Sequence, residues 1–128
     1  MILGIGIDIC EVDRFKRLVN EEAFLQKVFT PSEISYGKKY KHPAPAFAVR
    51  FAAKEAFVKA IGTGIRDGVS LKEIEVIKDK FGKPDLQLHG KTKEVFSGLG
   101  GGEICISLSH EKHSAVAVVI IEKEIKYE

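Results

Sequence analysis

The first residues of the chain alternate between aliphatic side chains and side chains that are small or polar. The second set consists of Gly4, Gly6, Asp8 and Cys10. A period of two with β-branched residues predicts a strand over residues 3–10. The glycine-lined face of this strand cannot fill a core by itself. Glycine within a strand often marks a place where another group approaches the backbone closely.

A helical pattern follows the strand. Apolar positions three and four residues apart predict a helix over residues 12–29 that is broken near Asn20. The next sequence, Thr-Pro-Ser-Glu, has the pattern of a helix start, with Thr30 as the N-cap and Glu33 at the third helical position. We expect a second, short helix to run from there to about Tyr40.

The strongest helical signal in the chain covers residues 46–61. This stretch is rich in alanine, contains neither glycine nor proline, and is followed by Gly62, a residue type that commonly ends helices. Two prolines within residues 42–45 separate it from the preceding helix, because a helix seldom continues through proline. The pattern predicts a long helix near the centre of the sequence.

The remainder of the chain is mostly strand. The predicted antiparallel pairs are residues 74–77 with 86–88 and residues 104–108 with 115–122. Residues 91–99 predict a short helix between the two pairs. The segment 115–121 is apolar on both faces, which is typical of a central strand or of a strand buried between subunits. These elements predict an α+β fold in which a mainly antiparallel sheet packs against a long central helix.

Length and composition narrow the class of protein. With 128 residues the chain is expected to form one domain, residues 1–128. Its net charge of +2 is too small for a general nucleic-acid or membrane binder, so a charged partner must be met by a local patch. No apolar run approaches the roughly 18 residues of a membrane span. Cys10 and Cys105 lie far apart in the sequence, which favours free thiols in a reducing cytoplasm.

One face of the long helix carries candidate chemistry. Its stripe, at spacings of three and four residues, consists of Phe51, Glu55, Lys59 and Gly62. The simplest interpretation is a solvated ion pair between Glu55 and Lys59, with Arg50 and Lys54 flanking it. The alternative is a site in which Glu55 binds a metal and Lys59 binds a phosphate. The alanines of the helix would allow another backbone to pack closely against it.

Asp8 is a second candidate, because a lone carboxylate in an apolar strand is costly to bury unless it is paired or bound to a metal. The alternative is an aspartate that faces water at a strand end. Asp8 and Glu55 together would offer two oxygen ligands, which suffices for Mg²⁺ when water and substrate phosphates complete its shell. The spacing alone does not bring the two carboxylates together.

Two further features are less specific. His110 ends a predicted strand, but a lone histidine is more often structural or exposed. The other histidines have no ligand at zinc-site spacing, so a histidine-based zinc centre is disfavoured. Arg14, Arg17 and Leu18 lie within one turn of the first helix, where they form either a small basic and apolar patch or an ordinary solvated face.

Four segments of the chain carry a family resemblance. They are GIGIDICEVDRF at the start, RFAAKEAFVKAIGTGI in the long helix, GKP in the first hairpin and SLSHE near the end. With these motifs the chain resembles the holo-[acyl-carrier-protein] synthase family, the small bacterial 4'-phosphopantetheinyl transferases. The resemblance covers residues 3–122, and the helix motif is its most specific part. Residues 11–45 and 85–103 match the family only in general character.

The resemblance implies an activity and a set of site residues. The family transfers the phosphopantetheine arm of coenzyme A to a serine of an apo acyl carrier protein and releases adenosine 3',5'-bisphosphate. Asp8 and Glu55 resemble the two carboxylates that hold Mg²⁺ against the pyrophosphate. Lys59 resembles the lysine that contacts phosphate, and His110 resembles the histidine near the coenzyme A phosphates.

The surroundings of the site are implied in the same way. Positions that line the coenzyme A cleft in the family are occupied here by Arg50, Phe51, Gly62, Lys83 and Pro84. Arg14 and Arg17 lie on the helix that docks the acidic carrier protein. Members of the family with this length are homotrimers with sites between subunits, and we expect the same assembly here.

Positioning and charge neutralisation dominate phosphoryl-type transfer, so the protein needs few covalent steps. Glu55 is the first candidate for the base that takes the serine proton, and His110 is the second. Two other functions use the same residues: a metal-dependent phosphohydrolase, and a non-catalytic module that binds a carrier protein or a nucleotide. The first would release phosphate without a carrier protein, and the second would tolerate Glu55→Gln.

Overall fold

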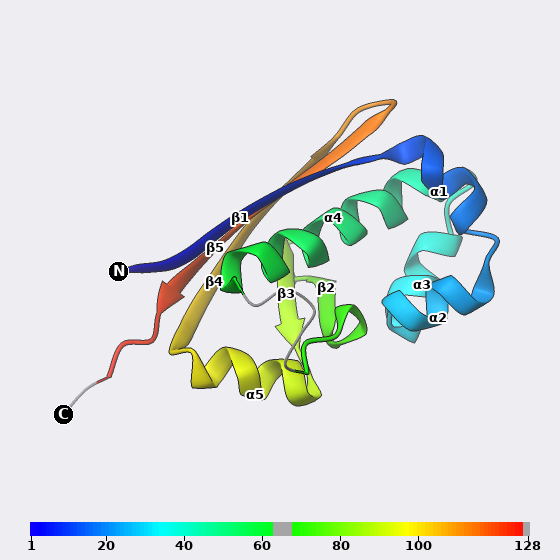
Figure 1. Cartoon of the computed structure of the whole chain (residues 1–128). Coiled ribbons are helices and arrows are strands. Elements are labelled where there is room, and N and C mark those ends of the chain that lie inside the picture. Colours follow the sequence, from blue (N-terminus) through cyan, green and yellow to red (C-terminus); the bar gives the residue numbers. More distant parts are fainter. Residues whose placement is uncertain (63–67, 127–128) are drawn as a thin grey trace.

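The computed structural model describes residues 1–62 and 68–126. In chain order the elements are β1 (Ile2–Glu11), α1 (Val12–Leu18), α2 (Glu22–Val28), α3 (Pro31–Lys38), α4 (Ala44–Ile61), η1 (Leu71–Glu73), β2 (Ile74–Lys78), β3 (Pro84–Leu88), α5 (Gly90–Gly98), β4 (Gly101–His110) and β5 (Ser114–Lys123). The long helix α4 lies along one face of a three-stranded sheet, and the short helices α1 to α3 gather at one end (Figure 1). The predicted α+β class is confirmed.

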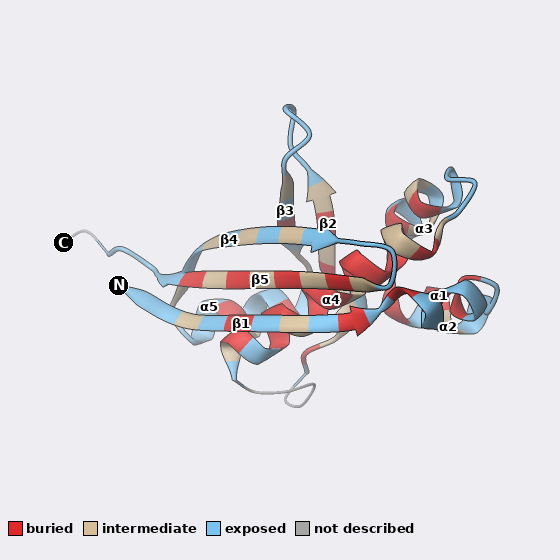
Figure 2. Cartoon of the chain, turned by 90° about the horizontal axis from the view of Figure 1, so that it is seen from above, coloured by how far each residue is buried: buried red, intermediate tan, exposed pale blue. Residues whose placement is uncertain are grey.

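Both sheets are antiparallel. The larger sheet has the order β1-β5-β4, so the last strand of the chain is its centre, and the smaller sheet is the β2–β3 hairpin (Figure 2). Because β5 is central, its apolar character on both faces agrees with the first of the two interpretations of that segment. The structure describes no helix long and apolar enough to cross a membrane.

The helix boundaries follow from local chemistry. The break near Asn20 separates α1 from α2, and the capping box at the start of α3 is confirmed: the Glu33 N–H donates to Thr30 Oγ1 at 3.2 Å, and the Thr30 N–H donates to Glu33 Oε1 at 2.9 Å. The helix α4 begins at Ala44, two residues earlier than predicted. Pro45 falls in its first turn, where the missing N–H has no helical partner to lose.

The glycines of β1 allow α4 to approach the strand closely. A Cβ atom added to Gly6 would lie 1.9 Å from the backbone oxygen of Ala56, and one added to Gly4 would lie 2.0 Å from that of Ala60. Such distances are far below van der Waals contact, so any larger residue would push the helix away. The group that the glycine-lined face admits is therefore the backbone of α4.

The two faces of the larger sheet differ in burial. The side facing α4 carries fully buried residues of β5: Ala115, Ala117, Val119 and Ile121. The opposite side carries Ile5, Ile7 and Ile9 of β1, which are 59%, 61% and 70% exposed. Beside them lie half-buried residues of β5, namely Val116, Val118 and Ile120 (Figure 2). We call this second side the outer face; it is apolar and uncovered in the single chain.

Candidate functional site

The strand β1 and the helix α4 bring Asp8 and Lys59 into contact. Asp8 is opposite Ala117 in the sheet register, so its side chain lies on the side that faces α4. The Lys59 ammonium donates to Asp8 Oδ1 at 2.9 Å and to the carbonyl oxygen of Ile7 at 3.1 Å. The Asp8 side chain is 15% exposed and that of Lys59 is 56% exposed, so this ion pair is open to solvent on one side.

Glu55 lies in the same electrostatic environment. Burial raises the pKa of its carboxyl group, and the negative charge of Asp8 raises it further, while the positive charge of Lys59 acts in the opposite direction. Asp8 and Glu55 are thus close enough for their charges to interact. The simplest interpretation of the helix stripe is therefore incomplete, because the ammonium of Lys59 is bound by Asp8 on a different element.

Two carboxylates whose charges act on each other are ligands of the kind that Mg²⁺ uses. The described residues contain no group of three or more histidine, cysteine, aspartate or glutamate side chains that could hold a metal ion. A Mg²⁺ site commonly uses only one or two carboxylates, and water and substrate phosphates supply the rest. A divalent cation between Asp8 and Glu55 would also relieve the repulsion from Asp8 that adds to the effect of burial on the pKa of Glu55. These residues therefore fit such an ion.

A separate cavity of about 420 Å³ opens at the other edge of the sheet. Residues of α3, α4, the β2–β3 hairpin and β4 surround it, together with the segment that precedes α4. Its lining consists of Tyr36, Tyr40, His42, Pro45, Ala46, Val49, Arg50, Lys78, Gly82, Pro84, Leu108 and His110. We call this cavity the basic-aromatic cleft. Its composition suits a ligand that carries both an aromatic ring and anionic groups.

Arg50 is the most constrained charge in the basic-aromatic cleft. The residue is 7% exposed, and its guanidinium carbon lies 4.3 Å from the centre of the Tyr36 ring. Its Nη1 donates to the carbonyl oxygen of Ala46 at 3.1 Å, which leaves the other N–H groups of the fork for a ligand. Stacking and this hydrogen bond hold the guanidinium in one orientation before any ligand arrives.

Sequence analysis did not identify Tyr36 or Lys78 as site residues. The Tyr36 hydroxyl is hydrogen-bonded to the Lys78 ammonium and, at 2.7 Å, to the hydroxyl of Tyr40. The bond from Lys78 is the main cause that lowers the pKa of Tyr36 to about 8, and the bond to Tyr40 contributes. The available signal was the pair of tyrosines four residues apart, one on the short polar helix α3 and the other just beyond its end.

The structure separates the predicted site residues into two groups. Asp8, Glu55 and Lys59 lie at the β1 edge, whereas Arg50, Pro84 and His110 line the basic-aromatic cleft at the β4 edge. In the register, Asp8 is opposite Ala117, which is in turn opposite Leu108, so the central strand lies between the two edges.

Three residues predicted to line the coenzyme A cleft are not among the residues that line this cavity. Phe51 packs against Phe15, with ring centres 5.5 Å apart, in an aromatic cluster between α1 and α4. Gly62 is the left-handed C-cap of α4, with a φ angle of 75°; the motif residues 63–65 that follow it lie outside the described residues. Lys83 is exposed in the hairpin turn, where its backbone N–H donates to Asp79 Oδ1 at 2.9 Å.

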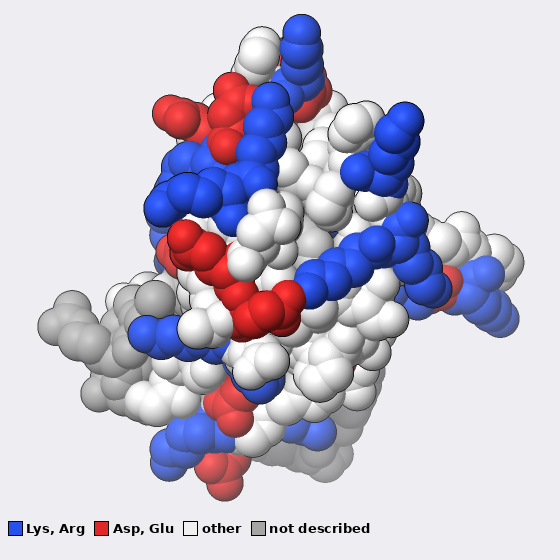
Figure 3. Space-filling view, turned by 90° about the vertical axis from the view of Figure 1, so that its right-hand side faces the viewer, with Lys and Arg blue, Asp and Glu red and all other residues white. Residues whose placement is uncertain are grey.

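The surface of α1 carries the two arginines predicted to bind a partner. Arg14 is exposed, and Arg17 pairs loosely with Glu21 at 3.5 Å. Basic side chains are numerous on this end of the molecule but alternate with acidic ones (Figure 3). Leu18, which one of the two interpretations of this helix face made the apolar part of a patch, is instead buried beneath the helix, because the apolar stripe of α1 faces the core.

Comparisons with known proteins agree with the sequence motifs. A family model described as the 4'-phosphopantetheinyl transferase superfamily matches residues 4–118. A holo-[acyl-carrier-protein] synthase of Geotalea daltonii is 50% identical over 125 residues, which are 96% of this chain and all of that protein. A relative with the same name from Treponema denticola is 50% identical over 123 residues, 95% of this chain and 99% of that protein.

Solved structures show the same fold. A holo-[acyl-carrier-protein] synthase from Neisseria meningitidis is 38% identical, with a TM-score of 0.87 and coverage of 96% of this chain and 100% of that chain. One from Bacillus anthracis, solved in complex with CoA (3',5'-ADP), is also 38% identical, with a TM-score of 0.80 and coverage of 97% and 99%. In sequence and in fold, this chain belongs to the 4'-phosphopantetheinyl transferase superfamily.

Proposed function

We propose that this chain is a single-domain holo-[acyl-carrier-protein] synthase. It transfers the 4'-phosphopantetheine group of coenzyme A to a serine of apo acyl carrier protein and yields holo acyl carrier protein and adenosine 3',5'-bisphosphate. The observation that carries the proposal is the 50% identity to synthases of this name over nearly the full length of both chains. A cytoplasmic location is part of the proposal, because the reducing conditions there suit the free thiols of Cys10 and Cys105.

Asp8 and Glu55 are proposed as the ligands of a Mg²⁺ ion. When bound, the ion would neutralise charge on the pyrophosphate of coenzyme A and stabilise the leaving group. Lys59 is proposed to contact phosphate. Its ammonium is already held by bonds to Asp8 and to the carbonyl oxygen of Ile7, and, being partly exposed, it retains one further donor for a phosphate oxygen. This arrangement supports transition-state stabilisation by fixed charges.

The transfer itself requires one proton movement. The serine oxygen forms a bond to the β-phosphorus of coenzyme A, the bond to the bridging oxygen breaks, and adenosine 3',5'-bisphosphate leaves. Glu55 is the proposed acceptor of the serine proton, because its half-buried carboxylate lies where the charges of Asp8 and Lys59 act on it, and a carboxylate can serve as a general base. His110, which is exposed at the end of β4, is the second candidate.

The basic-aromatic cleft is proposed to bind the nucleotide part of coenzyme A. Arg50 and Lys78 supply positive charge, and Tyr36 and Pro84 supply flat or apolar surface for a purine. Relatives solved in complex with coenzyme A, such as the synthase from Helicobacter pylori, have the same fold with a TM-score of 0.80. They support the assignment of a cleft for this substrate.

We propose that the complete site forms between subunits of a homotrimer. Asp8 and the cleft residue His110 lie on opposite edges of the sheet, and two strand spacings correspond to about 10 Å between backbones. A neighbouring copy can supply the cleft that faces the carboxylates of the first. The apolar outer face supports such an assembly, because closed rotational symmetry is the usual way to cover a surface of this kind.

Recognition of the acidic carrier protein is proposed to depend on Arg14 and Arg17. Because the net charge is only +2, this local patch must provide the attraction. Arg14→Glu is expected to weaken carrier binding by about 1 kcal/mol, mainly through the association rate, with a smaller loss at high salt. Surface plasmon resonance measures both quantities. Lys93→Glu, the same charge change on α5, is the control and should leave binding unchanged.

Mass spectrometry of the carrier protein tests the proposed function. Incubation of the protein with apo acyl carrier protein, coenzyme A and Mg²⁺ should increase the carrier mass by one phosphopantetheine group. Asp8→Asn and Glu55→Gln should each abolish this increase while the circular dichroism spectrum is retained. Phosphate release without a change in carrier mass would instead indicate a phosphohydrolase. Near-normal activity of Glu55→Gln at saturating Mg²⁺ would show that the assigned metal ligand is wrong.

A further inference from the structure

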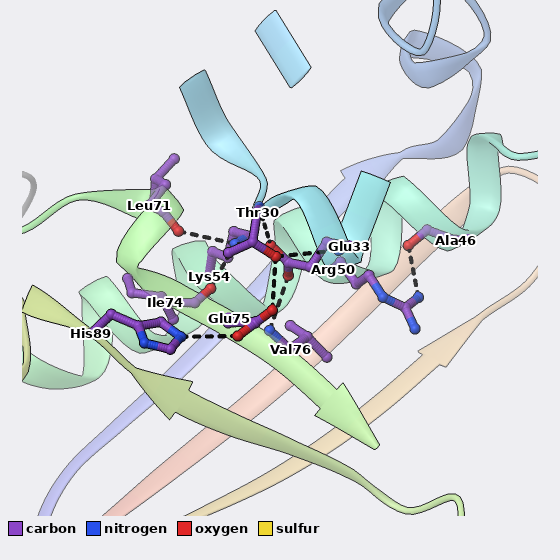
Figure 4. A network of polar contacts seen from close by, with 10 residues as sticks. All are labelled: Thr30, Glu33, Ala46, Arg50, Lys54, Leu71, Ile74, Glu75, Val76 and His89. Atoms are coloured by element: carbon purple, nitrogen blue, oxygen red, sulfur yellow. Dashed lines mark hydrogen bonds and ion pairs between the residues drawn. The ribbon is translucent and has the colours of Figure 1, made fainter. Parts of the chain in front are cut away.

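Lys54 is the residue before the proposed metal ligand Glu55, but its side chain is completely buried. Its ammonium donates to three acceptors: Glu33 Oε1 at 2.8 Å, the carbonyl oxygen of Leu71 at 3.0 Å and that of Ile74 at 2.6 Å. These acceptors belong to α3, η1 and β2 (Figure 4). All three donors of the ammonium are therefore used within the protein, and none is left for a substrate.

The carboxylate of Glu33 links Lys54 to the backbone of two further segments. Glu33 is 2% exposed and accepts hydrogen bonds from Lys54, from the backbone N–H of Thr30 at 2.9 Å and from that of Val76 at 2.9 Å. Burial lowers the pKa of Lys54, while the charge of Glu33 opposes this change. One buried ion pair thus joins the start of α3 and the middle of β2 to the middle of α4 (Figure 4).

A second carboxylate extends the connection to the start of α5. The Thr30 hydroxyl donates to Glu75 Oε2 at 2.8 Å, and Glu75 Oε1 lies 2.9 Å from Nε2 of His89, the residue that precedes α5. These residues surround the Lys54–Glu33 pair on the side of α4 that faces away from the larger sheet (Figure 4). We call this set of contacts the Lys54 network.

On the opposite side, which faces the larger sheet, close backbone packing and the bonds of Lys59 to β1 hold α4, but few large side chains interlock. Towards the sheet it presents alanines, and the backbone of Ala56 and Ala60 rests against Gly6 and Gly4. Small side chains form shallow ridges, so they resist rotation of a helix about its axis less than interlocking large ones do. A buried polar contact can supply that register, which is the best-attested use of such groups.

The register of α4 determines the position of the groups proposed for the reaction. Successive residues of a helix are about 100° apart around its axis, so holding Lys54 on one side directs Glu55 and Lys59 towards β1. Arg50 precedes Lys54 by one turn and lies in the basic-aromatic cleft. The other cleft walls, α3 with Tyr36 and β2 with Lys78, are the elements that Glu33 ties to Lys54.

We propose that Lys54 is a positioning residue for the transfer reaction. By bonding α3, η1 and β2 it sets the rotation of α4 and thereby aligns the Asp8–Glu55–Lys59 group with Arg50 and the cleft walls. It touches neither the substrate nor the metal. This inference rests on the proposed function, because it assigns the residues that Lys54 positions to that reaction.

The variant that tests the proposal is Lys54→Met/Glu33→Gln. Lys54→Met alone would leave a buried, unpaired carboxylate, which is strongly destabilising. The double variant removes both charges, retains similar side-chain volume, and keeps an amide oxygen that can accept from the Thr30 N–H. Thr92→Val is the matched control. It removes a buried hydroxyl that bonds Ser70 N and Glu73 Oε1, contacts that do not involve α4.

Steady-state kinetics with apo carrier protein are measured for each variant well below its melting temperature. The double variant is expected to lose kcat on the order of 100-fold, because small misplacements of reacting groups have effects of this size. Its KM for coenzyme A should also rise several-fold, and calorimetry should show the same weakening of coenzyme A binding. Thr92→Val should retain the wild-type kcat and KM at a comparable loss of melting temperature.

Amide hydrogen exchange across α4 provides a readout that does not depend on activity. Faster exchange in the double variant than in Thr92→Val, at equal global stability, supports a register role for Lys54. Wild-type kinetics in the folded double variant, or equal kinetic losses in Thr92→Val, would overturn the proposal. If the wild-type protein does not modify the carrier, the proposed function fails, and unchanged exchange in α4 would separately refute the role in register.

Discussion

The two faces of the larger sheet differ in how they are packed. Towards α4 the sheet presents two glycines of β1, which meet the helix backbone closely, and the small or branched side chains of β5, which are fully buried. On the outer face, Ile5, Ile7 and Ile9 are more than half exposed in the single chain. The larger aliphatic side chains of β1 thus point away from α4.

This difference separates two kinds of packing. The inner face is complete within one chain, because helix and strand meet over atoms that leave no room for more. The outer face lacks a partner, although burying an isoleucine side chain is worth about 1.5–3 kcal/mol. Uncovered apolar surface of this extent is typical of an interface rather than of a surface that remains in water. The comparison therefore supports the proposal that other copies cover the outer face.

Of the changes that test this comparison, a charge introduced on the outer face should have the largest effect, on both assembly and activity. Val118 lies in the central strand, opposite Ile7 of β1 and Ser107 of β4. In Val118→Asp, assembly would bury an unpaired carboxylate, so we expect both the trimer and the activity to be lost. Light scattering and the transfer assay measure the two losses. Val118→Ile is the apolar control, and a monomeric Val118→Asp protein with full activity would show that the site does not need a second copy.

A methyl group added on the inner face should instead lower the stability of the folded chain. In Gly6→Ala the new Cβ would lie 1.9 Å from the carbonyl oxygen of Ala56, so the strand and helix must separate. We expect a loss of about 3 kcal/mol in the free energy of unfolding, at the upper end for overpacking. Gly98→Ala in α5 is the control, because nothing lies within 4 Å of its added Cβ. Equal denaturant midpoints for the two variants would contradict the close approach of α4.

The two cysteines report on the two faces separately. Cys10 lies on the inner face, where its thiol donates to the carbonyl oxygen of Ala48 at 3.1 Å, whereas Cys105 is exposed on the outer face. At pH 8 a thiol reagent should therefore modify Cys105 in dilute protein and leave Cys10 unmodified. Protection of Cys105 at high protein concentration is expected if copies cover the outer face. Modification of Cys105 that is independent of concentration would place the interface elsewhere.

The smallest expected effect is the pH dependence that Cys10 adds to stability. Burial, followed by the charge of Asp8, raises the pKa of the Cys10 thiol from 9.0 to about 11. Between these values the unfolded chain loses the proton and the folded protein keeps it, so stability falls as the pH rises from 9 to 11. Thermal melts over this range should show a shallower fall in Cys10→Ala. Parallel melting curves would mean that the thiol titrates normally in the folded state.

Local chemistry made several features predictable. The alternation of β1, the break near Asn20 and the capping box of Thr30 with Glu33 all depend on residues within a few positions of one another. The start of α4 was placed two residues late, because proline was interpreted as a boundary although it is well tolerated in a first turn. The presence of Tyr36 and Lys78 in one cleft was not predicted, because the two residues are distant in the sequence and only the folded chain brings them together.

The amino-acid sequence by itself determined the element types, the α+β class, the family motifs and the unusual glycine face of β1. Only the tertiary structure decided which groups meet. Lys59 bonds Asp8, fifty-one positions away, and Lys54 was expected beside the solvated stripe but is buried against Glu33. Spacing along a helix indicates which residues share a face. What that face contacts depends on elements folded from distant parts of the chain, and those contacts set the burial and charge that make a side chain structural or functional.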